Sequence, residues 1–168
     1  MVHVRSRFPC VLALLLAGCH GPARPPVTNV SLELQLSAAS ALPGDVVTIS
    51  ATVSNLGETT VLHGACCYSN GIGLWVLDPD GKPVRLYTGE LPACPCWFNE
   101  PLRPGMHLQD AYWPFNGKLY DERGEPYEAP LGRYTVIAIF SWHMAGNSDT
   151  DRREERAVFT WGKPKAGG

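Results

Sequence analysis

The chain has 168 residues and a formal net charge of −2, from 14 basic and 16 acidic side chains. This length suits one domain with a hydrophobic core of its own. The near balance of charge and the lack of a basic stripe in the sequence argue against a nucleic-acid partner, because phosphate backbones are bound by clustered Lys and Arg side chains.

The first 18 residues are typical of a secretion signal. Arg5 and Arg7 form a short basic head, and an apolar run follows over residues 8–17. Such a run is too short to cross a hydrocarbon core of about 30 Å. The Leu16-Ala17-Gly18-Cys19 sequence at its end resembles the lipobox of bacterial lipoprotein signal peptides. The resemblance implies that the chain is cut before Cys19 and that this cysteine is acylated.

We therefore expect a protein of the bacterial cell envelope that is lipid-anchored and faces the periplasm or the exterior. The alternative is an ordinary cleaved signal followed by a chance cysteine. More than one acyl chain is needed to anchor a soluble domain stably, and lipoprotein processing supplies several. Residues 20–28 contain three prolines, which predict a semi-rigid tether between the membrane and the folded domain.

Residues 29–162 are predicted to form the folded domain. Apolar and polar residues alternate over residues 30–36 and 46–53, which is the period of a half-buried strand. An Asp-Gly corner at residues 78–81 predicts a hairpin. Further strands are expected at residues 72–77, 82–87, 106–113, 134–142 and 157–161. The remaining segments are expected to be a loop with about one short strand at 114–132, a polar loop at 145–155 and a flexible tail at 163–168.

Seven to eight short strands, punctuated by turns and without a helical period, predict an all-β fold, an immunoglobulin-like antiparallel β-sandwich. Tyr134 follows the turn at Gly132, where such sandwiches place a tyrosine corner; an ordinary strand aromatic is the alternative. Ile137 and Ile139 compete for the inward face of their strand. The predicted core consists of Val47, Ile49, Ala51, Val53, Tyr134, Val136, Ala138 and Phe140.

The order of several turns and strands resembles one known family, the intracellular proteinase inhibitor (BsuPI-like) domains. The resemblance covers most of residues 40–142 and implies an immunoglobulin-like sandwich. It also implies proteinase inhibition as an alternative function. The four cysteines of the domain and the long 114–132 segment depart from the family pattern. The segments that carry the resemblance are residues 43–45, 55–57, 77–82 and 102–105, Trp113, and residues 132–136.

Four cysteines remain after removal of the signal and lipidation of Cys19: Cys66, Cys67, Cys94 and Cys96. An even number in an oxidising compartment predicts two disulfides that join the first pair to the second, with the connectivity open. One disulfide with free thiols is an alternative. Another is thiolate binding of copper or zinc, with His63 and either Met106 or His107 nearby in the sequence. We expect no cofactor.

The sequence offers little for catalysis, and we do not expect an enzyme. No Gly-x-Ser-x-Gly elbow, phosphate loop or paired-histidine metal motif occurs in it. Nothing in the sequence indicates that Ser69 or Ser141 meets a histidine. Residues 78–81 and 147–151 have the acidic spacing of the first half of a calcium loop without its later ligands, so a hairpin and an ordinary loop are expected there.

Five aromatic residues predict a binding surface: Trp97, Phe98, Tyr112, Trp113 and Phe115. Large aromatic side chains concentrate at interfaces, and loops on a rigid sandwich carry function. We therefore expect a non-catalytic binding or structural domain whose partner is an envelope protein or a protease. As an inhibitor, it would present the disulfide-braced loop around residues 88–100 to a protease cleft. The alternative is that these aromatics fill the core.

Overall fold

The computed structural model describes residues 29–65, 71–87 and 98–162. In these ranges it contains strands and no helix, so the prediction of an all-β sandwich is confirmed. No helix long and apolar enough to cross a bilayer occurs in these ranges. The strands are β1 (Val30–Leu36), β2 (Ser40–Ala41), β3 (Val47–Asn55), β4 (Val61–Ala65), β5 (Ile72–Leu77), β6 (Pro83–Val84), β7 (Phe98–Leu102), β8 (His107–Phe115), β9 (Lys118–Tyr120), β10 (Pro126–Glu128), β11 (Gly132–Met144) and β12 (Thr150–Trp161).

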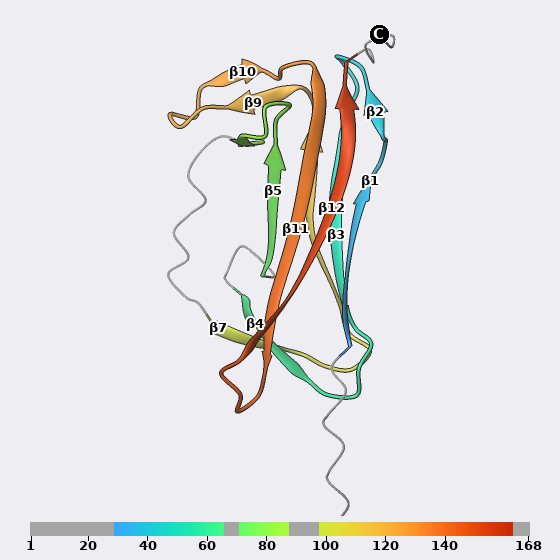
Figure 1. The fold of residues 1–168 in the computed structure, drawn as a ribbon, viewed down its shortest axis with the longest axis vertical. Coiled ribbons are helices and arrows are strands. Elements are labelled where there is room, and N and C mark those ends of the chain that lie inside the picture. The colour runs from blue at the N-terminus through green and yellow to red at the C-terminus, as the bar shows by residue number, and fades with distance from the viewer. Residues whose placement is uncertain (1–28, 66–70, 88–97, 163–168) are drawn as a thin grey trace, which may run out of the picture.

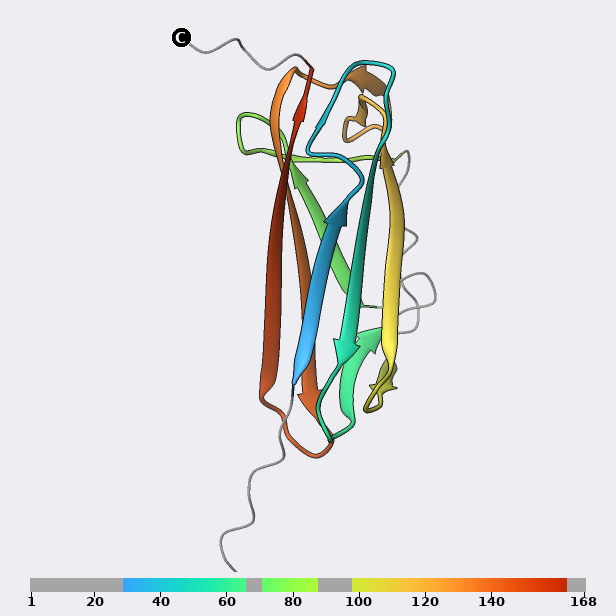
Figure 2. The ribbon, with the colours of Figure 1, turned by 90° about the vertical axis from the view of Figure 1, so that its right-hand side faces the viewer.

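The strands form two layers that face each other (Figures 1 and 2). The three-stranded sheet has the order β1-β3-β8. The large sheet has the order β2-β12-β11-β4-β7, with β5 paired to β11 and β6 paired to β5. A separate β9–β10 hairpin projects from one end of the sandwich (Figure 1).

β11 organises the large sheet. It is 13 residues long and pairs with β12 along one side. Its other side pairs with β5 over residues 135–140 and with β4 over residues 142–144. Its side chains alternate between the core and the outer face. All eight predicted core residues, four on β3 and four on β11, are at most 1% exposed. Ile137 and Ile139 lie on the outer face, where they are half-buried.

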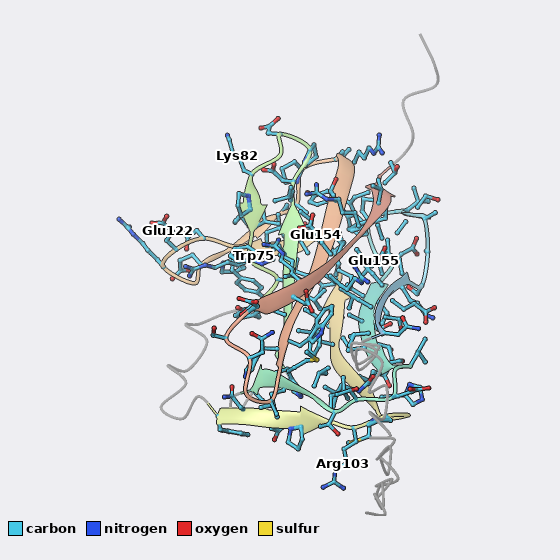
Figure 3. The ribbon with its side chains drawn as sticks, turned by 60° about the horizontal axis from the view of Figure 1, so that its bottom comes forward. Trp75, Lys82, Arg103, Glu122, Glu154 and Glu155 are labelled. Atoms are coloured by element: carbon cyan, nitrogen blue, oxygen red, sulfur yellow. The ribbon has the colours of Figure 1, made fainter. Side chains whose placement is uncertain are left out.

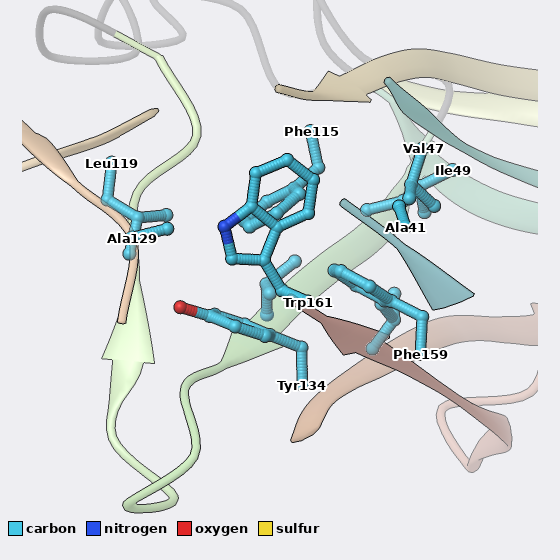
Figure 4. Packing of buried hydrophobic residues seen from close by; sticks show 11 residues of the cluster. Ala41, Val47, Ile49, Phe115, Leu119, Ala129, Tyr134, Phe159 and Trp161 are labelled. Atoms are coloured by element: carbon cyan, nitrogen blue, oxygen red, sulfur yellow. The ribbon is translucent and has the colours of Figure 1, made fainter. Parts of the chain in front are cut away.

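An aromatic cluster fills one end of the core (Figure 4). The ring of Phe115 lies 4.9 to 5.0 Å, between centroids, from the rings of Tyr134, Phe159 and Trp161. Gly117 closes against this cluster with a φ of +83°, and a Cβ there would lie 2.2 Å from the Trp161 ring. A side chain at residue 117 would therefore meet both backbone strain and a fixed indole.

Tyr134 forms the predicted tyrosine corner. Its hydroxyl donates a hydrogen bond of 2.8 Å to the carbonyl of Pro130, four residues upstream. Burial raises the pKa of this hydroxyl far above its ordinary value, so it stays protonated and able to donate.

Asn55 fastens the opposite end of the sandwich and is fully buried. Its Nδ2 donates to the carbonyls of Thr59 and Leu102, each at 2.8 Å. Its Oδ1 accepts from the backbone N–H of Gly57 at 3.0 Å. Its own backbone bonds to the turn at residues 103–106. One side chain therefore ties the end of β3 to the approach to β4 and the end of β7.

Several strand predictions were wrong in extent. β12 begins at Thr150, whereas residues 145–155 were predicted to be a loop, because β11 continues to Met144 and supplies a partner along the whole charged segment. Residues 114–132 contain a two-stranded hairpin rather than at most one strand. The strand predicted over residues 82–87 is reduced to β6 and a bridge at Arg85. β4 and β7 were not predicted.

Candidate functional site

The predicted disulfide region is attached to two neighbouring strands. β4 ends at Ala65 and β7 begins at Phe98, and these two residues stand directly opposite each other. In the sequence, Cys66 and Cys67 follow Ala65, and Cys94 and Cys96 precede Phe98. All four cysteines lie outside the described residues. Neighbouring strands are about 5 Å apart, which is within the Cα separation that a disulfide spans. Ala65 and Phe98, the described residues that border the two cysteine-bearing segments in the sequence, therefore lie at adjacent positions in the sheet.

His63 lies in the core, two residues before Ala65 on β4. Its side chain is 1% exposed and packs at a centroid distance of 5.3 Å against the ring of Phe140. Within residues 29–65, 71–87 and 98–162, neither ring nitrogen has a hydrogen-bond partner, and the same is true of Nε1 of Trp142, the residue opposite His63 on β11. A buried nitrogen that makes no hydrogen bond in the folded protein has lost its hydrogen bonds to water without replacement. These three nitrogens therefore lower the stability of the folded domain.

Burial lowers the pKa of His63 below its ordinary value. Two neighbours raise the pKa in part: the Gly64 backbone and the Glu100 carboxylate on β7. The Gly64 backbone lies near the ring but does not form a hydrogen bond with it. The residues that face His63 from β11, Phe140 and Trp142, carry no charge. The imidazole is therefore held in its neutral form.

The wild-type protein is expected to lose stability as the pH falls from about 7.5 to about 5, and a His63→Leu variant is expected to lose less. The unfolded chain takes up a proton near the ordinary histidine pKa, whereas the folded chain resists protonation until a lower pH. Stability linked to His63 is therefore complete above the unfolded pKa and is lost between the two values. Urea unfolding across this pH range measures it, and equal slopes for the two proteins would contradict it.

The structure divides the predicted aromatic surface. Phe98, at the start of β7 in the large sheet, is 42% exposed. Phe115, at the far end of β8 in the three-stranded sheet, is fully buried, so its assignment to a binding surface was wrong. It is core because its strand places it opposite Val47 and inside the aromatic cluster.

The other three residues of that surface are not placed. Trp97 lies outside the described residues, as do the side chains of Tyr112 and Trp113. The backbone of β8 is described there, and its register against β3 shifts between Ile49 and Ala51. Two residues of β8 therefore stand opposite Ser50, which is a β-bulge of the kind that redirects side chains at an edge strand.

The first acidic segment forms a turn, and the second does so up to Asp149, whereas its residues 150–151 begin β12. The Asp78 carboxylate accepts hydrogen bonds from the backbone N–H groups of Asp80 and Lys82, at 2.9 and 2.8 Å. The Asn147 side chain accepts from the N–H of Asp149 at 3.0 Å. These oxygens stabilise their own backbone turns. In residues 29–65, 71–87 and 98–162, no group of three or more His, Cys, Asp and Glu side chains is arranged to hold a metal ion.

Sequence reasoning missed one serine–histidine pair. Ser54 Oγ and His107 Nδ1 are 2.7 Å apart across the β3–β8 pair. Such a contact is the first element of an activated nucleophile, which also needs a third group to orient the base. Within the described part of the chain, no side chain other than Ser54 hydrogen-bonds to His107. The pair is exposed and forms a hydrogen bond between neighbouring strands.

No protein-family model matches the chain, and neither does any curated protein. Similar solved structures include a β-glucosidase from Erythrobacter marinus, with 18% identity and a TM-score of 0.40 over 80% of this chain and 15% of that one. A β-glucosidase from Listeria innocua has 12% identity and a TM-score of 0.41 over 81% and 16%. The chain therefore spans less than a fifth of the length of these enzymes, and the likeness does not bear on its activity.

Proposed function

We propose that this chain is a lipid-anchored protein of the bacterial cell envelope whose single β-sandwich is a non-catalytic binding domain. The observation that carries the proposal is the Leu-Ala-Gly-Cys sequence ending at Cys19, placed directly before a proline-rich segment and a sandwich whose first strand begins at Val30. A secretion signal, an acylation site, a tether and a rigid domain follow one another in the order that display on a membrane requires.

The direction in which the domain is displayed follows from its strands. β1 begins at the end of the sandwich where the β3–β4 and β11–β12 connections lie (Figure 1). The hairpins β5–β6 and β9–β10 lie at the other end. In this proposal, a tether that joins the domain just before Val30 would place the end with the β3–β4 and β11–β12 connections nearer the membrane and the two hairpins farther from it.

Cys19→Ser is expected to abolish lipid labelling and to release the protein from the membrane fraction. The reason is that acylation at this thiol supplies the proposed attachment. Metabolic labelling with a palmitate analogue, followed by fractionation, measures both effects. Cys10→Ser is the matched control, because Cys10 lies in the signal that is removed; it should keep the label. A labelled Cys19→Ser protein, or an unlabelled wild type, would refute the anchor.

Proteinase inhibition is the second candidate function, favoured by the opposition of Ala65 and Phe98. The predicted inhibitory loop precedes Phe98, and Ala65, which precedes Cys66 and Cys67, stands opposite that residue. A loop whose cysteines are joined to Cys66 and Cys67 would lose little entropy when it enters a protease cleft. Slowed cleavage of a peptide substrate by members of a protease panel would support inhibition. Unchanged cleavage across the panel would leave the binding role without an inhibitory one.

We expect Cys66, Cys67, Cys94 and Cys96 to be oxidised in protein taken from the envelope, with each member of the first pair bonded to one of the second. Each disulfide would stabilise the domain by about 3 to 4 kcal/mol through the unfolded chain. Non-reducing peptide mapping after thiol alkylation measures this. Four alkylated thiols would contradict it, and copper or zinc at about one per chain would then indicate the thiolate metal site instead.

A further inference from the structure

The outer face of the large sheet carries an exposed tryptophan. Trp75 on β5 is 53% exposed, whereas Ile72 and Val76 on the same strand are buried in the core. Tryptophan side chains are on average highly buried, because their large apolar surface is costly to hydrate. Trp75 is also distinct from every residue of the aromatic surface considered above.

Gly73 lies next to the indole of Trp75 on the outer face of β5. It precedes Trp75 by two residues, so both positions are on the same face of β5. A Cβ at Gly73 would lie 3.7 Å from Nε1 of Trp75 and 3.8 Å from the carbonyl oxygen of Ile139. The Nε1 edge of the indole therefore lies close to Gly73, where no side chain contacts it, and Trp75 as a whole is 53% exposed.

The strand register places outward-facing residues of β11 and then of β12 beside Trp75 and Gly73, which we call the platform. Ile137 on β11 stands between Trp75 and Arg156 of β12, and Ile139 stands between Gly73 and Glu154. Both isoleucines are half-buried. Two strand spacings separate Trp75 from Arg156, which is about 10 Å. Figure 3 shows Trp75 and Glu154 over these strands, in agreement with the register.

The row on β12 is an ordered set of charges. Arg152 and Arg156 each donate to the Glu154 carboxylate at 2.7 Å, one to each oxygen. These hydrogen bonds lower the pKa of Glu154, so its carboxylate stays ionised. Exposed ion pairs contribute little to stability, so what matters about this row is its arrangement, with two guanidinium groups flanking one carboxylate on the outer face. Each guanidinium has five donors, and the shared carboxylate uses part of them.

We propose that this face, made of Trp75, Gly73, Ile137 and the Arg152–Glu154–Arg156 row, binds a saccharide chain. A pyranose ring has a C–H face that packs on an open indole, and hydroxyl groups that both donate and accept hydrogen bonds. The ordered row offers donors and acceptors side by side, and about 10 Å between platform and row accommodates two consecutive sugar rings.

A protein partner fits this face less well. Protein interfaces have a desolvated apolar centre that is depleted in charge. Here the apolar part consists of one indole and two half-buried isoleucines, and a charged row borders it directly. Small-molecule sites combine aromatic side chains with a few positioned polar groups, and Trp75 and the charged row bring both to this open face of the sheet. The proposal draws on the proposed envelope location for the source of the saccharide alone.

Binding of chitohexaose, cellohexaose and soluble peptidoglycan strands to the full lipidated protein in detergent tests the proposal, by calorimetry. We expect at least one of the three to bind the wild type. Trp75→Ala should weaken that binding roughly tenfold or more, and Trp75→Tyr should retain most of it, because a flat ring is kept. Val46→Ala is the control, since Val46 is also 53% exposed but lies outside this face, before β3; it should bind like the wild type.

Two results would overturn the proposal. The first is that none of the three saccharides binds at millimolar concentration, including the case in which Trp75 is needed to capture an envelope protein. The second is that Trp75→Ala binds as well as the wild type, with its fold intact by circular dichroism. Neither result depends on the label at Cys19, so failure of this site and failure of the lipid anchor are distinguishable.

Discussion

Replacing Phe115 with alanine is expected to lower the free energy of unfolding by about 3 to 5 kcal/mol. The side chain is fully buried and contacts three other aromatic rings at 4.9 to 5.0 Å between centroids. Its removal leaves a cavity, because Trp161 and Phe159 are themselves fixed in the core and cannot collapse into the space. Urea unfolding of the two proteins measures the difference.

Phe98→Ala is the matched control, since the same atoms are removed from a residue that is 42% exposed. We expect a loss of about 1 kcal/mol or less there, as for other surface substitutions. A comparable loss at both positions would mean that Phe98 also has a structural role. If Phe98→Ala instead loses a partner at unchanged stability, this end of β7 is part of the binding surface.

Replacing Asn55 with alanine is expected to destabilise the domain by about 3 kcal/mol or more. The substitution removes two donated hydrogen bonds and one accepted one. The carbonyl of Leu102, which is itself fully buried, then has lost a donor that water cannot easily replace. Unfolding by urea again gives the difference, and retention of wild-type stability would contradict the role assigned to this side chain.

Two further variants identify the cause. Asn147→Ala makes the same change in an exposed turn, where one hydrogen bond of 3.0 Å is lost, and is expected to cost less than about 1 kcal/mol. Asn55→Asp keeps the shape but replaces the donating NH₂ with an acceptor that faces two carbonyls. At neutral pH it should destabilise the domain at least as much as alanine does, because the carboxylate is charged, buried and unable to donate.

The sequence predicted those features that depend on local periodicity. Alternation identified the inward residues of β3 and β11, since successive side chains of a strand point to opposite faces whatever its partner is. The tyrosine corner was also predicted, because its hydroxyl bonds to Pro130 only four residues away. The turns at residues 78–81 and 147–149 likewise satisfy their own backbone.

The alternation of apolar and polar residues did not identify a strand that is exposed to solvent but paired through its backbone. The charged residues 150–155 were predicted to be part of a loop because they contain no apolar face, and their exposure agrees with that composition. They are nevertheless a strand, because β11 extends far enough to pair with them. An outer strand needs backbone partners but no apolar side chains, and charges there protect its open edge from association.

The candidate sites were less predictable than the core, because each depends on contacts between distant parts of the chain. Phe115 and Phe98 are alike in sequence, and the assignment of one to the core and the other to the surface depends on the sheet to which each strand belongs. The platform around Trp75 likewise depends on the register of β5 and β12 against β11.

By itself, the sequence determined the all-β class, the inward faces of two strands and the order of signal, acylation site, tether and domain as expectations, since periodicity and short motifs are local properties. The tertiary structure decided which strands are neighbours, and therefore that Asn55 reaches Leu102, that His63 is buried without a hydrogen-bond partner among the described residues, and that Trp75 lies beside the charged row. Those contacts depend on pairings between residues far apart in the chain, which no local pattern specifies.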